Sequence, residues 1–179
     1  ATDYATSIQF YFPQASRVDG ATGTVLDATP TGLGQYFARY PRIVALGNRW
    51  LAMWQRNFSH DDPLAELSGV FLEAEGTPSA EFRTTNYLGA GYTPDLAASA
   101  TEAMVVFRSG SPAAANQDVR LFRVLVDGTF PDPAGGFVLS DANDRQAEPR
   151  VGWTGADYCA VWQDKRNSVT FFDERTDIY

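Results

Sequence analysis

The chain has 179 residues, of which 44% are hydrophobic and 13% aromatic, enough apolar side chains to build a packed core. Its net charge of −8 and its pI near 4.5 argue against non-specific binding to nucleic acid. No apolar run approaches the roughly 18 residues needed to cross a membrane, and a single cysteine excludes an internal disulfide.

Residues 1–40 are predicted to form the outer half of a repeated unit. Within them, Gly23-Thr-Val-Leu-Asp27 matches Gly128-Thr-Phe-Pro-Asp132 further along the chain. Both segments begin at a glycine, which is typical of a turn, and continue into apolar residues of a strand. The first segment begins 18 residues before Pro41, which is the first residue of the next unit.

Two complete units follow, at residues 41–93 and 94–148, and part of another follows at 149–179. Each begins with a proline, and these prolines are spaced 53 and 55 residues apart. An aromatic residue lies thirteen positions after each proline; the pairs are Pro41 with Trp54, Pro94 with Phe107, and Pro149 with Trp162. A period of about fifty residues with strand-like content is typical of β-propeller blades rather than helical repeats. We expect each proline at the start of a strand, where no ladder hydrogen bond is lost.

Every unit opens with a predicted hairpin of two short strands. In the first unit, Ile43–Leu46 and Trp50–Trp54 are separated by Gly47-Asn-Arg49, which is typical of a hairpin turn. The second strand is apolar on both faces, so it must be covered on both sides. Packing between neighbouring blades provides that cover. Cys159 lies in the corresponding strand of the last unit, and we expect it to be a buried small hydrophobic residue.

The last unit, 149–179, contains only the front half of a blade. Its final residues, Asp177-Ile-Tyr179, match Asp118-Val-Arg120, which begin the third strand of the preceding unit. Joined to 1–40, this unit would make one more blade, as in propellers closed by their N- and C-terminal strands. The sequence therefore predicts a single all-β domain over 1–179, built of about three blades of four antiparallel strands.

Three blades are too few to close a ring, because propellers typically have about four to eight. The ring is therefore expected to be incomplete, or completed by other chain segments or copies. One explanation is that the chain is a piece of a longer protein. Its first residue is Ala and not Met, which fits either such a piece or the removal of a leader. Another is that two copies associate to supply six blades. A compact β fold other than a propeller is the third alternative.

The last unit resembles the repeats of large secreted bacterial β-propeller proteins. The resemblance rests on Arg145–Arg166, which contains Val-Trp-Gln-Asp, on Asp177-Ile-Tyr179, and on Arg17-Val18 with the Gly23–Asp27 segment. The unit at 94–148 departs from it, with Phe107-Arg-Ser in place of Trp-Gln-Asp. The resemblance implies a propeller fold and an extracellular or periplasmic setting. That family has no uniform catalytic motif, so no functional residue carries over from it.

Insertions after the second strand of each unit are expected to line one rim of the blades, where a binding site is most plausible. The candidate binding residues there are His60, Asp61, Asp62, Asp164 and Arg166. A solvated loop is favoured for His60 to Asp62 over a metal or acid–base site, and no Gly-x-Ser-x-Gly elbow is present. Asp164 is expected to hydrogen-bond a neighbouring loop.

No cofactor is expected, although oxygen ligands for Ca²⁺ are available. Asp141-Ala-Asn-Asp144 and Asp118 carry carboxylates of the kind that Ca²⁺ prefers, but their spacing is not that of a calcium loop. The inner strands offer almost no carboxylates, only Glu102 and Asp157 at hairpin turns, which disfavours a glycoside hydrolase.

Aromatic residues allow a second reading of the inner strands. Trp50, Trp153 and Tyr158 could stack on sugars, but packing in the core is favoured for all three. The sequence therefore favours a non-enzymatic exported module that acts in protein–protein interaction or as an accessory or scaffold subunit. A carbohydrate-binding propeller is the main alternative, and a glycoside hydrolase is the third.

Overall fold

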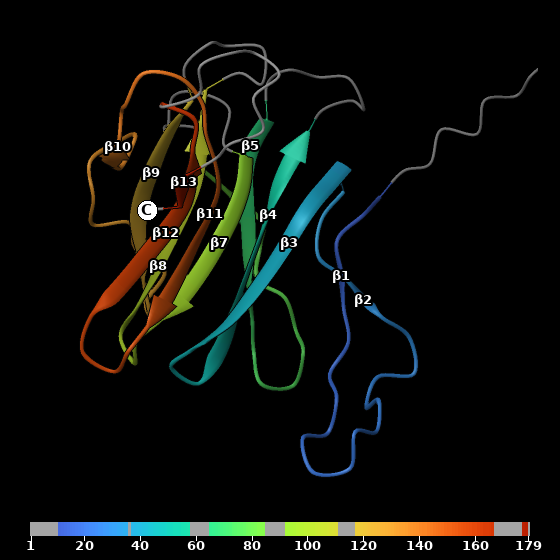
Figure 1. Ribbon diagram of the computed structural model, residues 1–179. Coiled ribbons are helices and arrows are strands. Elements are labelled where there is room, and N and C mark those ends of the chain that lie inside the picture. Colours follow the sequence, from blue (N-terminus) through green and yellow to red (C-terminus); the bar gives the residue numbers. More distant parts are fainter. Residues whose placement is uncertain are drawn as a thin grey trace, which may run out of the picture.

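The computed structural model describes residues 11–35, 37–57, 65–84, 92–110, 117–166 and 177–178. Within these residues the chain forms strands and no helix, as the sequence predicts (Figure 1). It follows that no described segment is a helix able to cross a membrane. The strands form a stack of three antiparallel sheets, with a small two-stranded piece at one end of the stack (Figure 1).

The three sheets are successive propeller blades, in which strands follow one another across the sheet. The first blade consists of β3 (Phe37–Leu46), β4 (Arg49–Asn57), β5 (Ala65–Leu72) and β6 (Phe82–Arg83). The second blade consists of β7 (Tyr92–Ala98), β8 (Glu102–Ser109), β9 (Asp118–Leu125) and β10 (Phe137–Ser140). The third blade consists of β11 (Gln146–Trp153), β12 (Tyr158–Asp164) and β13 (Asp177–Ile178).

The predicted hairpins are present at the start of every blade, as β3–β4, β7–β8 and β11–β12. Gly47 in the first turn has a φ of +64°, and Gly155 in the last has a φ of +101°. Side chains disfavour these left-handed conformations, so glycine suits both turns. β13 pairs with the end of β12 in the same register in which β9 pairs with β8, as the match of Asp177 to Asp118 predicts.

The prolines lie inside the first strands and not at their starts, so that expectation was wrong. Pairing with the next strand shifts its register at Pro41, at Pro94 and at Pro149. The preceding residues have positive φ, namely +53° at Tyr40, +47° at Thr93 and +49° at Glu148. A bulge leaves one residue out of the ladder, so a proline without an N–H can occupy it. The same bulge therefore recurs in all three blades.

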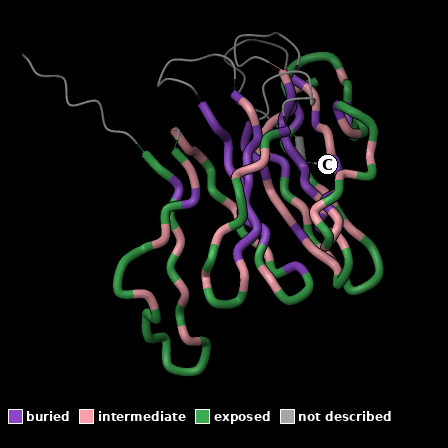
Figure 2. The backbone as a smooth tube through the Cα atoms, turned by 180° about the vertical axis from the view of Figure 1, so that it is seen from behind, coloured by how far each residue is buried: buried purple, intermediate pink, exposed green. Residues whose placement is uncertain are grey.

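The first and second blades enclose the main hydrophobic core (Figure 2). Leu51 and Met53 of β4 face the second blade, where they pack with Val105, Phe107 and Phe122. The alternate residues of β4 face the other way, into a smaller cluster that contains Leu33, Ala52, Trp54, Val70 and Leu72. The predicted cover on both faces is therefore confirmed for β4.

The third blade is covered on one face only. Along β12, Tyr158, Ala160 and Trp162 are half-buried toward the second blade, while the alternate residues Cys159 and Val161 are exposed. Cover on both faces was thus wrongly predicted for this strand, because no further blade follows it in the described chain. For the same reason Cys159 is exposed and not buried as expected.

Residues 11–35 form an N-terminal arm on the outer side of the first blade (Figure 1). The arm contains β1 (Gln14–Ala15) and β2 (Thr31–Gly32), which pair antiparallel. It lies at the opposite end of the stack from the third blade (Figure 1), so the described arm and the third blade do not form one sheet. Three blades turn through too small an arc to bring these ends together. The ring is open, as the number of units predicts.

The core between the first two blades supplies a direct test of the packing. Phe122 is fully buried at 0% exposure, whereas Phe137 on the adjacent strand β10 is 47% exposed. We expect Phe122→Ala to lower the free energy of unfolding by about 3–5 kcal/mol, because it leaves a cavity among close-packed side chains. Phe137→Ala, which removes the same atoms from an exposed site, should change it by less than about 1 kcal/mol. Urea unfolding followed by tryptophan fluorescence measures both; equal losses would contradict the described core.

Candidate functional site

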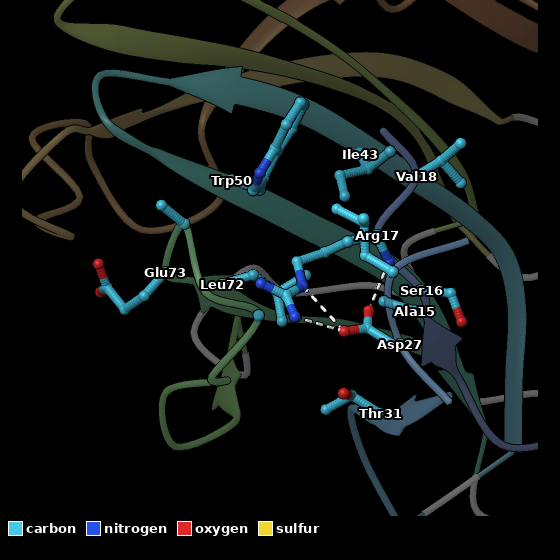
Figure 3. A pocket seen from close by; sticks show the side chains of 13 residues that line it. Ala15, Ser16, Arg17, Val18, Asp27, Thr31, Ile43, Trp50, Leu72 and Glu73 are labelled. Carbon is cyan, nitrogen blue, oxygen red and sulfur yellow. Dashed lines mark hydrogen bonds and ion pairs between the residues drawn. The ribbon is translucent and has the colours of Figure 1, made fainter. Parts of the chain in front are cut away.

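A cleft of about 430 Å³ lies between the N-terminal arm and the first blade (Figure 3). Its walls come from the arm, from the hairpin β3–β4 and from the end of β5. The lining residues are Ala15, Ser16, Arg17, Val18, Leu26, Asp27, Thr31, Ile43, Trp50, Leu72, Glu73, Ala74 and Gly76. The cleft thus opens where the outer half of a blade meets a complete one.

The walls of the cleft expose large apolar side chains. Ile43 on β3 is 55% exposed and Trp50 on β4 is 43% exposed, and Val18 and Leu26 of the arm are exposed as well. The expectation of core packing was therefore wrong for Trp50. Trp153 and Tyr158 agree better with the expectation of core packing, because both are half-buried and their ring centroids lie 4.5 Å apart.

One ion pair holds the arm in shape beside the cleft (Figure 3). The backbone N–H of Arg17 donates to Asp27 Oδ2 at 2.6 Å, and its Nε and Nη2 donate to Asp27 Oδ1 at 2.9 and 2.6 Å. The hydrogen bonds from the guanidinium, and to a smaller extent the one from the backbone N–H, hold the pKa of Asp27 below its ordinary value. The ion pair therefore joins the segment before the turn at Gly23 to the segment after it.

The second blade contains an equivalent arrangement of an arginine and an aspartate, and we call both arrangements clasps. The backbone N–H of Arg123 donates to Asp132 Oδ2 at 2.7 Å, and its Nε and Nη2 donate to Asp132 Oδ1 at 3.1 and 2.6 Å. The pairing of Ala15 with Thr31 in the arm also matches that of Leu121 with Phe137 between β9 and β10. The N-terminal arm therefore reproduces the third and fourth strands of a blade. The sequence placed the arm's arginine in the repeat but did not indicate its partner.

At the other end of the stack, the third blade presents an open face. Val161 is 42% exposed and lies opposite Arg150 on β11, which is also exposed. Cys159 lies opposite Gly152, and both are exposed. These four residues form one continuous surface on the side away from the second blade, and we call it the open face of the third blade.

Polar contacts hold the three blades to one another near the first strands. Arg42 Nε of the first blade donates to Asp95 Oδ1 of the second at 3.2 Å, and the N–H of Val151 in the third donates to Asp95 Oδ2 at 2.9 Å. Tyr158 Oη donates to the carbonyl oxygen of Glu102 at 2.9 Å and accepts a hydrogen bond from the N–H of Ser99 at 3.0 Å. Each blade is thus positioned by its neighbour.

Of the predicted binding residues, the structure places Asp164 and Arg166 in contact with each other. Asp164 accepts from the N–H and Nε of Arg166, both at 2.9 Å, and from Nη2, while Trp162 Nε1 donates to it at 3.4 Å. Burial alone would raise the pKa of Asp164, but these hydrogen bonds together lower it. Arg166 Nη2 also donates to Ser140 Oγ on β10 at 3.4 Å. It is therefore Arg166, and not Asp164, that reaches a neighbouring blade.

The predicted rim lies where the second strands end. Asp164 at the end of β12 pairs with Gln146, whose N–H donates to the carbonyl oxygen of Gln117 at 2.9 Å, beside the end of β8. The ends of β8 and β12 therefore lie close together. His60, Asp61 and Asp62 lie outside the described residues. Within the described ranges, no three His, Cys, Asp or Glu side chains are grouped so that they could hold a metal ion.

The arm's clasp gives a prediction for pH. Because the pKa of Asp27 is lower folded than unfolded, the clasp stabilises the arm fully above the ordinary pKa of about 3.9, and this contribution is lost as the pH falls through the folded value. In an NMR titration, Asp27 should titrate below that ordinary value. Arg17→Gln should return it toward the ordinary value, whereas the matched change Arg123→Gln should leave it unmoved. An unshifted Asp27 in the unaltered protein would contradict the clasp.

No protein-family model matches this chain, and no curated protein matches it. Its function must therefore be argued from the surfaces at the two ends of the stack.

Proposed function

We propose that this chain is a non-enzymatic propeller module, exported to an extracellular or periplasmic setting, that binds another protein through the open ends of its blade stack. Its role is that of an interaction or scaffold subunit. The observation that carries the proposal is the exposure of apolar side chains at both ends, on the cleft beside the N-terminal arm and on the open face of the third blade. Contiguous apolar surface of this kind marks interaction sites in soluble proteins.

Comparison of equivalent positions shows how unusual this exposure is within the fold. Met53, Val106 and Val161 all lie twelve positions after the proline of their unit. The first two are fully buried at 0% exposure, each toward the blade that follows, whereas Val161 is 42% exposed. The same surface is therefore an interface in two blades and is uncovered in the third.

Several acidic side chains of the stack have structural partners. Asp27, Asp132 and Asp164 each accept several hydrogen bonds from one arginine, and Asp95 joins the three first strands. Carboxylates held in this way are fixed in position, which suits a scaffold better than proton transfer. This supports a binding role over a hydrolytic one.

The proposal predicts covalent capture of a partner at both ends. A photo-reactive phenylalanine analogue placed at Val161 or at Ile43 should yield protein adducts when the full chain is expressed in its native host and irradiated, because both side chains would lie in the interface. The same analogue at Val138 on β10, which is equally exposed but away from both ends, is the matched control. Adducts at Val138 alone, or at none of the three, would contradict the proposal.

Carbohydrate binding is a second candidate, and the exposure of Trp50 beside the cleft favours it. An exposed indole next to polar groups such as those of Arg17 and Thr31 can stack on a sugar ring while its hydroxyls are hydrogen-bonded. If the cleft binds sugars, a glycan array will give hits that Trp50→Ala weakens at least tenfold and Phe137→Ala does not. An array without hits removes this candidate.

A further inference from the structure

We infer that Arg108, at the rim of the stack, binds a carboxylate ligand, which brings a counter-charge that no described residue supplies. Arg108 lies near the end of β8 in the second blade, where both neighbouring blades are present. The site is therefore distinct from the two open ends of the stack, and it does not rest on the proposed function. Three observations carry it: the burial of this arginine, its lack of partners, and the neutral residues at the equivalent positions.

Two arginines are buried among the described residues, and they differ in their partners. Arg56 near the end of β4 is 0% exposed, and its Nη1 and Nε lie 3.0 and 3.7 Å from carboxylate oxygens of Glu66 and Glu81. Arg108 is 7% exposed, and its Nε donates to no acceptor. No described residue forms an ion pair or a side-chain hydrogen bond with it. Because a guanidinium stays protonated in proteins, Arg108 is a buried cation without a described counter-ion, which is a costly state.

The surroundings of Arg108 compensate its charge only in part. Its Cζ lies 5.0 Å from the ring centroid of Tyr92, its partner in the β7–β8 ladder. Burial lowers the pKa of Arg108, and the positive charge of Arg145, just before β11, lowers it further. The carboxylate of Glu148 acts in the opposite direction, but it forms its ion pair with Arg150, at 3.2 Å. An added anion would therefore be attracted to this position.

The fold does not require a charge at the position of Arg108. Gln55 and Gln163 take the equivalent positions in the first and third blades, fourteen residues after the proline of their units, as Arg108 does in the second. Gln55 is also buried, at 3% exposure. A neutral amide thus occupies the same buried place in the first blade, and the hairpin forms there all the same. The charge in the second blade is therefore better explained by a ligand than by folding.

The chemistry around Arg108 favours a carboxylate over a phosphate. A guanidinium presents coplanar N–H donors that match the two oxygens of a carboxylate. Another buried donor without an acceptor, the hydroxyl of Thr93, lies one residue along the chain from Tyr92. The net charge of −8 and the nearby Glu148 repel a multiply charged phosphate more strongly than a singly charged carboxylate. The source of the carboxylate is either a small free acid or an Asp or Glu side chain of a bound protein.

The first experiment is an NMR titration of the isotope-labelled full chain with sodium acetate. It follows the Nε–H signal of Arg108, which is assigned by its loss in Arg108→Gln. We expect a saturable shift with a dissociation constant in the millimolar range, because so small a ligand makes few contacts. Sodium chloride at the same ionic strength should give no saturable shift, and sodium phosphate should bind more weakly than acetate. No saturable shift with acetate, or tighter binding of phosphate, would overturn the carboxylate site.

Thermal unfolding tests whether Arg108 already has a partner within the chain. Arg108→Gln introduces the side chain that the first blade buries at this position, so the variant should fold. Without added carboxylate, its Tm should equal or exceed that of the unaltered protein, because an unpaired buried charge has been removed. A lower Tm would show that Arg108 is paired internally, and the inference would fail.

The same measurement with saturating acetate has a matched control. Acetate should raise the Tm of the unaltered protein, because it binds the folded state only. It should raise the Tm of Arg123→Gln equally, since that variant loses the same charge from β9, beside Glu102 at the opposite end of β8. The Tm of Arg108→Gln should not respond. An equal response of all three proteins would mean that acetate acts elsewhere, and would contradict the site.

Peptides blocked at both ends separate the two sources of the carboxylate. If the side chain of a bound protein is the ligand, Gly-Glu-Gly should bind at least tenfold more tightly than acetate, and Gly-Gln-Gly should not bind. If a small free acid is the ligand, acetate should bind as tightly as Gly-Glu-Gly or more tightly. Both results support a carboxylate site, provided that Arg108→Gln abolishes the binding. Equal binding of Gly-Gln-Gly and Gly-Glu-Gly would exclude recognition of the carboxylate.

The failure of this inference can be told apart from that of the proposed function. Photo-capture at Val161 and Ile43 probes the ends of the stack, whereas the acetate titration probes the rim. Adducts at the ends without acetate binding would leave the scaffold role intact and remove the carboxylate site. Acetate binding without adducts would do the reverse.

Discussion

The whole structure depends on the need to cover the second strand of each blade on both faces. In β4, Leu51 and Met53 face one neighbour while Ala52 and Trp54 face the other, so the strand is stable only between two layers. This requirement makes the blades stack, and it makes each blade dependent on the next. It also explains why the ends of the stack differ from its interior, since the outer face of the first blade is covered only by the N-terminal arm and the outer face of the third blade has no neighbour among the described residues.

The arginine–carboxylate clasps act on a smaller scale within a blade. Arg17 with Asp27, and Arg123 with Asp132, each fasten the strand before a glycine turn to the strand after it. The outer strands β2, β6 and β10 are only two to four residues long and bring few ladder hydrogen bonds of their own. A bidentate contact to the backbone and side chain of one arginine compensates for that shortness. The clasp thus lets a short outer half keep its shape even where, as in the arm, the described residues include no inner half of its blade.

The sequence was sufficient to predict the blades, because proline spacing, glycine turns and two-sided apolar strands are local signals. The hairpins, the match of residues 23–27 to 128–132 and the incomplete ring all follow from them. The exposure of Cys159 and Trp50 could not be predicted in the same way, because it depends on which blades have neighbours. The bulges at the prolines were also missed, since they depend on the backbone of the preceding residue. Of the candidate site, the aromatic Trp50 was named from sequence, but the cleft beside it was not.

The recurring bulge has a consequence for how such a protein is built. Tyr40, Thr93 and Glu148 share a left-handed conformation immediately before a proline, although their side chains have little in common. Only the backbone is repeated at this point, and the side chain is free to vary. A gene could therefore be cut and rejoined at these sites so that whole units are duplicated, lost or exchanged as cassettes. Each product would keep the same bend in its first strand, and the number of units could change during evolution without redesign of the units themselves.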